Sequence, residues 1–123
     1  MENDKEKFKK DFKKRLYAWV LSVIRLLEKL PKNTVTDVLL KQLVRSSTSI
    51  LSNYIEANSA SSKKDFINFF THSLKSANES KVWIALLRDL DKGDKNKLED
   101  LLNELLEIAN ILASSILTLK GKK

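Results

Sequence analysis

Apolar residues recur at helical spacing through almost the whole chain. In the first segment, steps of four and three residues lead from Phe12 to Leu30, and a second apolar stripe runs beside the first. The last segment repeats this double pattern from Leu98 onward. Each pair of stripes forms an apolar face about 200° wide, which is more than one bundle core requires. We expect the surplus to be buried against further copies of the chain.

Breaks in this pattern divide the chain into four predicted helices. Pro31 bars the first helix from continuing, Asn58–Ser62 separates the second from the third, and Asp91–Asn96 contains the turn residue Gly93. We expect Thr34 or Thr36 to cap the second helix, and Ser61 or Ser62 to cap the third. The predicted helices cover about residues 4–30, 34–58, 61–90 and 97–119.

Short connections between long helices make sequence neighbours antiparallel. We therefore predict an all-α fold, an up-down-up-down antiparallel four-helix bundle formed by one domain over residues 1–123. Ser46–Ser49 lies in the middle of the second predicted helix, where serine is a poor helix former. We expect these serines to have a packing role.

The composition excludes several classes of protein. The chain has two Gly, one Pro and no Cys, which argues against a sandwich of short strands, a Gly-rich nucleotide loop, disulfides and thiolate zinc sites. Its opening segment is charged throughout, unlike a secretory signal. The longest late uncharged run, Ile108–Leu119, is shorter than the roughly 20 residues of a membrane span. We expect a cytoplasmic protein with no membrane partner.

The net charge of +7 is concentrated at one end of the predicted bundle. Residues 1–15, 56–66 and 118–123 share that end and sum to +6, whereas the opposite end sums to −1. Such a field attracts polyanions, and because most of the bases are lysines we expect sequence-independent contacts to phosphates. The alternative is a lysine-rich surface that only aids solubility. The candidate nucleic-acid-binding residues are Lys5, Lys7, Lys9, Lys10, Lys13, Lys14, Arg15, Lys63, Lys64, Lys120, Lys122 and Lys123.

The sequence contains no recognisable arrangement for catalysis or metal binding. Phe8 and Phe12 interleave the basic run, but their spacing of four residues is typical of a core rather than of a base-stacking surface. His72 is the only histidine, and Phe69 stands where a bundle di-iron motif requires Glu. Asp65 lies seven residues before His72, a spacing that we interpret as solvated positions on one helix face. We expect no enzymatic activity, no metal and no cofactor.

A polar constellation lies on the second and third predicted helices. Because the hairpin between them turns near residue 60, positions whose numbers sum to about 120 face each other. We predict a cross-helix polar layer with an ion pair between Arg45 and Glu79. It serves either as a network that fixes helix register, which we favour, or as a binding groove. The members of this layer are Gln42, Arg45, Ser49, Asn53, Glu56, Ser76 and Glu79.

At four places the sequence resembles a known family. The segments are Leu30–Pro31, Gln42–Asn58, Ser61–Phe66 and Lys75–Leu87. They resemble the four-helix-bundle family of bacterial ribosomal-RNA intervening-sequence proteins, which includes the accessory variability proteins of diversity-generating retroelements. The resemblance covers about residues 8–118 and is most specific in the stretch ANES-x-x-W-x-x-LL.

The resemblance implies a homopentameric barrel of bundles. Its retroelement branch implies binding of nucleic acid and of a partner reverse transcriptase. The chain departs from the family pattern at Ala57, where many members carry Gly, and at Lys81, where others have a second acid. We expect a non-enzymatic homo-oligomer that binds RNA or an RNA–DNA hybrid electrostatically, with a reverse transcriptase as candidate partner. The alternative is a protein-interaction scaffold with no nucleic-acid role.

Overall fold

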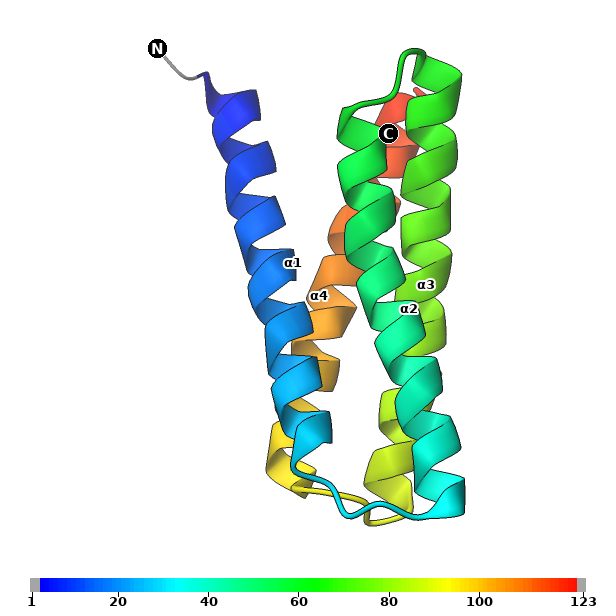
Figure 1. Ribbon diagram of the computed structural model, residues 1–123. Helices are drawn as coiled ribbons and strands as arrows, with labels where there is room; N and C mark the ends of the chain where they lie inside the picture. The colour runs from blue at the N-terminus through cyan, green and yellow to red at the C-terminus, as the bar shows by residue number, and fades with distance from the viewer. Residues whose placement is uncertain (1–2, 122–123) are drawn as a thin grey trace.

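Four long helices make up the structure, a computed structural model that describes residues 3–121 (Figure 1). No strand is present in this range, which confirms the predicted all-α class. Pro31 lies three residues beyond the last residue of the first helix, as the helix-breaking role of proline requires. The helices are α1 (Asp4–Glu28), α2 (Thr34–Asn58), α3 (Lys63–Asp89) and α4 (Lys95–Leu119).

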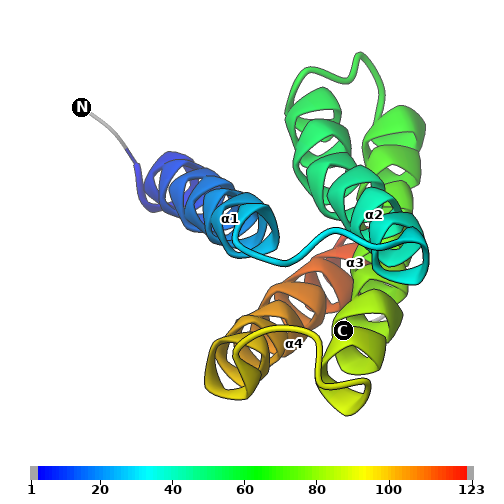
Figure 2. The ribbon, with the colours of Figure 1, turned by 60° about the horizontal axis from the view of Figure 1, so that its bottom comes forward.

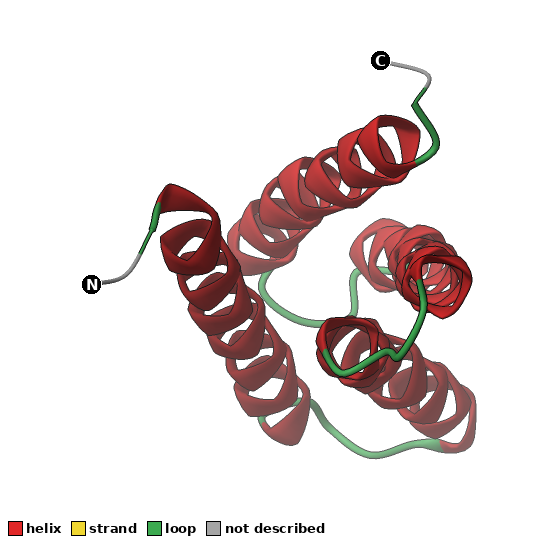
Figure 3. Ribbon diagram, turned by 90° about the horizontal axis from the view of Figure 1, so that it is seen from above, coloured by secondary structure: helices red, strands yellow, loops and turns green. Residues whose placement is uncertain are grey.

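The helices alternate in direction and pack in a ring. Contacts join α1 to α2, α2 to α3, α3 to α4 and α4 back to α1, and the α2–α3 pair is the most extensive. Seen from above, α1 lies to one side of α2 and α3 (Figure 3). The start of α1, the α2–α3 turn and the end of α4 therefore share one end of the bundle, the upper end in Figure 1. We call it the basic end.

Side-chain caps define where the helices begin. Ser62 caps α3 by accepting a hydrogen bond from the Asp65 amide at 3.1 Å, as predicted. The expectation for α2 was wrong, because its cap is Asn33, whose side-chain oxygen accepts from the Thr36 amide at 2.9 Å. An Asn side chain one position before the helix reaches the free amides of the first turn. Thr36 is instead buried, and Thr34 is the first helical residue.

The α3–α4 connection uses the turn chemistry that the sequence predicts. Gly93 has a φ of +100°, a conformation that residues with a Cβ rarely adopt. A Cβ at this position would lie 2.8 Å from Cδ2 of Leu30 in the α1–α2 connection. The α1–α2 and α3–α4 connections are therefore in contact at the end opposite the basic end, which faces the viewer in Figure 2.

The core receives side chains from all four helices. Leu16, Leu43, Ile84 and Leu105 are fully buried, one from each helix. The expectation that the apolar surplus of α1 is left for other copies holds only in part, because Val20 and Leu27 of its second stripe are buried within the single chain. The α1 helix packs on both α2 and α4, and so it needs a wide apolar face.

Serines allow α2 and α3 to approach closely. Ser46 of α2 and Ser80 of α3 are fully buried, and their Oγ atoms lie 2.7 Å apart. Ser73 of α3 is also buried and donates to the backbone carbonyl of Ile50 at 2.8 Å. Small side chains allow the two backbones to approach closely, and the buried hydroxyl groups form hydrogen bonds within the interface. The predicted packing role of the mid-helix serines is confirmed.

The α4 helix is apolar enough, by length and composition alone, to cross a membrane. This is weak evidence, because the core helix of a bundle has the same properties. Leu105, Ile108 and Leu112 of α4 are fully buried against the neighbouring helices. We therefore interpret the apolar character of α4 as that of a core helix.

Candidate nucleic-acid interface

The exposed lysines of α1 lie mostly on the side that faces away from the bundle. Lys7, Lys10 and Lys14 are spaced three and four residues apart, which places them on one helix face. The buried residues Phe12 and Leu16 occupy the opposite face. All the outward-facing lysines are exposed. We call Lys7, Lys10 and Lys14, together with exposed Lys13 at the flank of α1, the outer lysine stripe.

Other predicted basic residues also lie at the basic end. Lys63 and Lys64 form the first turn of α3, and Lys120 follows the last residue of α4. Lys5 and Lys9 lie on the inner side of α1, where they line a cavity. The topology therefore brings these residues to one end, as predicted from the sequence. Two further predicted residues, Lys122 and Lys123, lie outside the described part of the chain.

Arg15 differs from the rest of the predicted set, because it is engaged within the chain. Its Nε and Nη2 atoms each donate to a carboxylate oxygen of Glu104 at 2.6 Å, and Nη2 also reaches Glu107 at 3.1 Å. The hydrogen bonds with Glu104 raise the pKa of Arg15 and lower the pKa of Glu104. A guanidinium held in this way ties α1 to α4 and is not available for phosphates.

A second contact reinforces this attachment one turn along α1. The indole Nε1 of Trp19 donates to the backbone carbonyl of Leu101 in α4 at 2.9 Å. Sequence reasoning missed both contacts and assigned Arg15 to nucleic acid. The acids Glu104 and Glu107 form a visible pair on one helix face, but nothing in the sequence shows that α1 rather than solvent lies opposite. We call Arg15, Trp19 and Glu104 the α1–α4 clamp.

Beyond the clamp, α1 leans away from the other helices toward the basic end (Figure 1). A cavity of about 620 Å³ opens there between α1, the α2–α3 turn and the end of α4. Phe12 and Tyr54 meet edge to face in its wall, with ring centroids 5.0 Å apart. Burial raises the pKa of the Tyr54 phenol, against an opposing hydrogen bond from Asn58. Buried aromatic rings therefore form part of the cavity wall.

The expectation that Phe8 and Phe12 both belong to the core was half wrong. Phe12 is buried, whereas Phe8 is 53% exposed and its ring lies parallel to that of Phe12 with centroids 6.1 Å apart. Phe8 precedes Phe12 by one turn and lies where α1 has already diverged from the bundle. Phe8 consequently forms a wall of the cavity.

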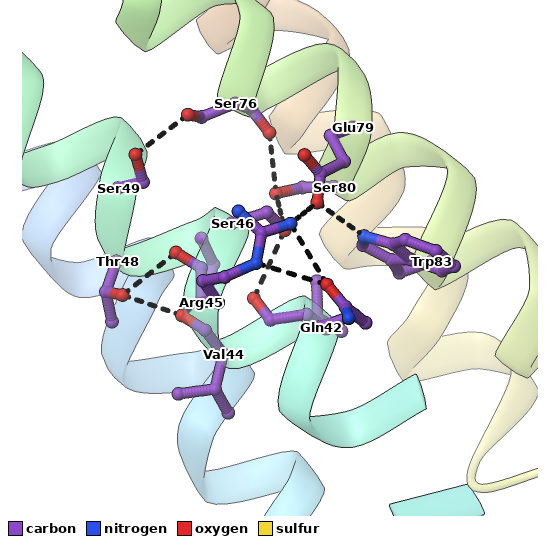
Figure 4. A network of polar contacts seen from close by, with 12 residues as sticks. Gln42, Val44, Arg45, Ser46, Thr48, Ser49, Ser76, Glu79, Ser80 and Trp83 are labelled. Atoms are coloured by element: carbon purple, nitrogen blue, oxygen red, sulfur yellow. Dashed lines mark hydrogen bonds and ion pairs between the residues drawn. The ribbon is translucent and has the colours of Figure 1, made fainter. Parts of the chain in front are cut away.

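The predicted ion pair of the polar layer is present. Nη2 of Arg45 in α2 donates to Oε2 of Glu79 in α3, and the same guanidinium donates to Oε1 of Gln42 at 3.0 Å (Figure 4). The indole of Trp83 donates to the same carboxylate at 3.0 Å. The Arg45 side chain is 56% exposed, so this part of the layer lies at the surface of the α2–α3 pair.

The second part of the layer lies one to two turns closer to the basic end. Ser76 Oγ donates to Ser49 Oγ at 2.9 Å, and the amide of Asn53 donates to both the hydroxyl and the carbonyl oxygen of Ser49. Glu56 does not join them, because its side chain is exposed on the last turns of α2. The remaining members of the layer form hydrogen bonds with one another across α2 and α3. This favours a network that fixes helix register over a binding groove.

His72 is exposed on α3 and is not part of a cluster. Within residues 3–121, no three His, Asp or Glu side chains come close enough together to hold a metal ion. The chain as a whole contains no Cys.

With this geometry in view, the chain can be compared with known proteins. The family model of the 23S rRNA-intervening sequence protein matches residues 9–114. The chain belongs to this family. Among solved structures, it is similar to a protein with unknown function from the S23 ribosomal protein family of Bacteroides thetaiotaomicron VPI-5482. The two are 32% identical with a TM-score of 0.78, over 85% of this chain and 97% of that chain. No curated protein matches the chain.

The family match covers the polar layer and the clamp, but only part of the basic end. Lys5, Lys7 and Lys120 lie outside residues 9–114, whereas the other members of the outer lysine stripe lie inside. This intervening-sequence protein therefore carries the family fold together with a basic surface that extends past the matched region at both ends.

Proposed function

We propose that this protein is a non-enzymatic, homo-oligomeric member of the intervening-sequence family that binds RNA or an RNA–DNA hybrid through the outer lysine stripe. The observation that carries the proposal is the placement of Lys7, Lys10 and Lys14 on the outward face of α1, at the same end as Lys63 and Lys64. Exposed ammonium groups at this spacing suit a phosphate backbone, because each contact releases condensed counterions.

The same argument indicates how the nucleic acid is bound. A lysine acts as a point charge and does not form the bidentate fork with which arginine reads guanine. The arginine nearest to the stripe, Arg15, is held by Glu104. We therefore propose binding that depends on backbone charge and helix shape rather than on base sequence.

Self-assembly multiplies this charge. Val82, Leu86 and Leu90 form an apolar stripe at steps of four on the outer face of α3, and all three are exposed in the single chain. Together with exposed Tyr17 on α1, they support assembly with further copies. We propose a homopentamer, the state that the family resemblance implies, in which five basic ends act together. A reverse transcriptase is the proposed protein partner, as in the retroelement branch.

The experiment is a charge reversal of the whole stripe. The variant Lys7→Glu, Lys10→Glu, Lys13→Glu and Lys14→Glu is titrated with an RNA hairpin and with a matched RNA–DNA hybrid across a range of salt concentrations. We expect the unmodified protein to bind both probes, with log affinity falling steeply as log salt rises. In the variant we expect affinity to fall by about a hundredfold or more, because four phosphate contacts are replaced by repulsion.

A matched control carries the same change of charge elsewhere. Lys29, Lys32, Lys41 and Lys75 are exposed and lie away from the basic end. Their replacement by Glu should weaken binding much less, although the net charge changes equally. An equal loss of affinity in both variants would mean that binding depends on the net charge of the protein and not on the position of the outer lysine stripe. The absence of salt-dependent binding in the unmodified protein would favour the scaffold alternative.

A further inference from the structure

The cavity at the basic end is open to solvent, and all the charged side chains in its lining are positive. Three lysines line it, namely Lys5 and Lys9 of α1 and Lys63 at the start of α3, and its lining includes no Asp or Glu. The start of α3 lies beside the cavity, where Ser62 caps the amide of Asp65 and the amides of Lys63 and Lys64 precede the first intrahelical hydrogen bonds. An anionic group at the mouth of the cavity would meet favourable charge from both sides.

The interior of the same cavity is apolar and aromatic. Phe66 and Phe70 of α3 stack with centroids 4.9 Å apart, and Phe70 contacts the ring of Tyr54 at 5.6 Å. Ile111 and Leu119 of α4 supply aliphatic surface on the other side. With a volume of about 620 Å³, the cavity falls in the range of sites that hold small organic ligands.

On the α4 side of the cavity, the lining hydroxyls already use their protons within the helix. Ser115 donates to the carbonyl of Ile111 at 2.8 Å, and Thr118 donates to the carbonyl of Ser114 at 3.1 Å. Other polar side chains of the lining, Asn58, Ser61 and Ser62, lie at or beside the α2–α3 turn. The α4 side therefore suits the apolar body of a ligand, whereas polar and charged groups of the ligand find partners at the turn.

The lysines are positioned for that group. The Nζ atom of Lys9 lies over the face of Phe66, 5.9 Å from the ring centroid, at the boundary between the aromatic interior and solvent. The side chain thus rests on an apolar surface with its ammonium group near the rim. Lys63 lies three residues before Phe66, one helical turn away and on the same side of α3.

We propose that this cavity binds an amphipathic anion, a small molecule with an aliphatic or aromatic body and a single carboxylate or similar acid group. The body lies among Phe8, Phe12, Phe66 and Phe70, and the acid group pairs with Lys9 and Lys63. The site is separate from the outer lysine stripe, none of whose residues lines the cavity, and does not depend on nucleic-acid binding.

The test uses three probes with the same chain length, each kept below the concentration at which it forms micelles. Dodecanoate is the anion, dodecanol the neutral analogue and dodecyltrimethylammonium the cation, and binding to the full chain is followed by isothermal titration calorimetry. We expect dodecanoate to bind saturably at one site per chain. Dodecanol should bind about tenfold more weakly, because it lacks the charge-assisted contacts, and the cation should show no saturable binding.

Two variants on different helices locate the site. Ser115→Phe fills the cavity from α4 and should abolish dodecanoate binding, whereas Asn110→Phe on the exposed side of α4 should leave it unchanged. Lys63→Glu should weaken binding by about tenfold or more, whereas Lys41→Glu on α2 should not. Circular dichroism and thermal melts establish that each variant is folded.

Three results would overturn the proposal. Equal binding of all three probes would show adsorption to apolar surface without recognition of charge. Dodecanoate binding that survives Ser115→Phe in a folded protein would place the site elsewhere. No dodecanoate binding to the unmodified chain would show that the cavity does not take this class of ligand. The four-residue reversal of the outer lysine stripe should bind dodecanoate normally, so failure of the nucleic-acid proposal is distinguishable from failure of this one.

Discussion

Single residues hold α1 in place against the rest of the bundle. Arg15 spans to Glu104 with two hydrogen bonds of 2.6 Å, and Trp19 reaches a backbone carbonyl of α4. The lowered pKa of Glu104 means that its charged form is stabilised by folding. Its contribution to stability is therefore present above the ordinary glutamate pKa of about 4.3 and is lost as pH falls through the lower folded value.

Replacement of Glu104 by Gln tests this linkage. We expect the variant to lose up to about 1 kcal/mol of stability near neutral pH, the range for a partly exposed ion pair. The difference from the unmodified protein should be smaller at about pH 3, below the ordinary glutamate pKa, and should vanish once Glu104 is protonated in both the folded and the unfolded states. Urea denaturation at both pH values measures the free energy of unfolding of the variant and of the unmodified protein. Glu107→Gln is the control, because its contact with Arg15 is longer, at 3.1 Å, and more exposed. The same loss at both pH values would contradict the linkage.

At the scale of elements, α2 and α3 form the most extensive helix pair of the molecule. Buried serines allow the two backbones to approach closely. The surface ion pair of Arg45 and Glu79 determines which turn of α2 lies opposite which turn of α3. A shift of one residue in this register would remove Ser46 from Ser80 and separate the ion pair at the same time. The polar layer therefore specifies alignment more than it adds stability.

Enlarging Ser80 tests this close packing. Ser80→Leu should destabilise the protein by about 2–3 kcal/mol, because the added side chain has no room between the two backbones. Ser80→Ala should cost less than about 1 kcal/mol, since it removes a hydroxyl without adding volume, and Ser46 keeps its contact with the carbonyl of Leu43. Denaturant unfolding compares the two. A Leu variant no less stable than the Ala variant would show that the α2–α3 interface is loose.

At the scale of the whole molecule, the row formed by Val82, Leu86 and Leu90 is an exposed apolar surface that assembly with further copies would bury. Val82 is 53% exposed and Leu86 and Leu90 continue its row. We expect native mass spectrometry to find a species of five chains. Leu86→Glu should shift it to a smaller mass while helix content is retained, because a charge in an apolar interface is costly. Asn110→Glu on exposed α4 surface is the control. A monomer in the unmodified protein would contradict the proposed pentamer.

The fold was predictable from the sequence because the spacing of apolar residues along a helix and the residues that end a helix are local features. Heptad steps and the breaks at Pro31, at Asn58–Ser62 and at Gly93 defined four helices, and alternation then determined their order. The Arg45–Glu79 pair was also predictable, because a hairpin turning near residue 60 fixes which positions face each other. The alignment of α1 against α4, and so the contact between Arg15 and Glu104, was not predictable, because no short connection relates the two helices. Arg15 was therefore assigned to nucleic acid, and the cavity went unseen because its walls come from opposite ends of the chain.

The α1–α4 clamp also has a consequence for how the protein is made. Arg15 and Glu104 are separated by 89 positions, so at ordinary rates of synthesis the arginine emerges roughly 5 to 20 s before its partner. During that interval the α2–α3 hairpin can close on its own local contacts, whereas α1 has no lateral partner on its α4 side. The most basic segment of the chain therefore leaves the ribosome before the helix that carries its clamp partner has been made. During that interval its positive charge lies beside the ribosome, a particle rich in phosphate, without the α4 contacts of the finished fold.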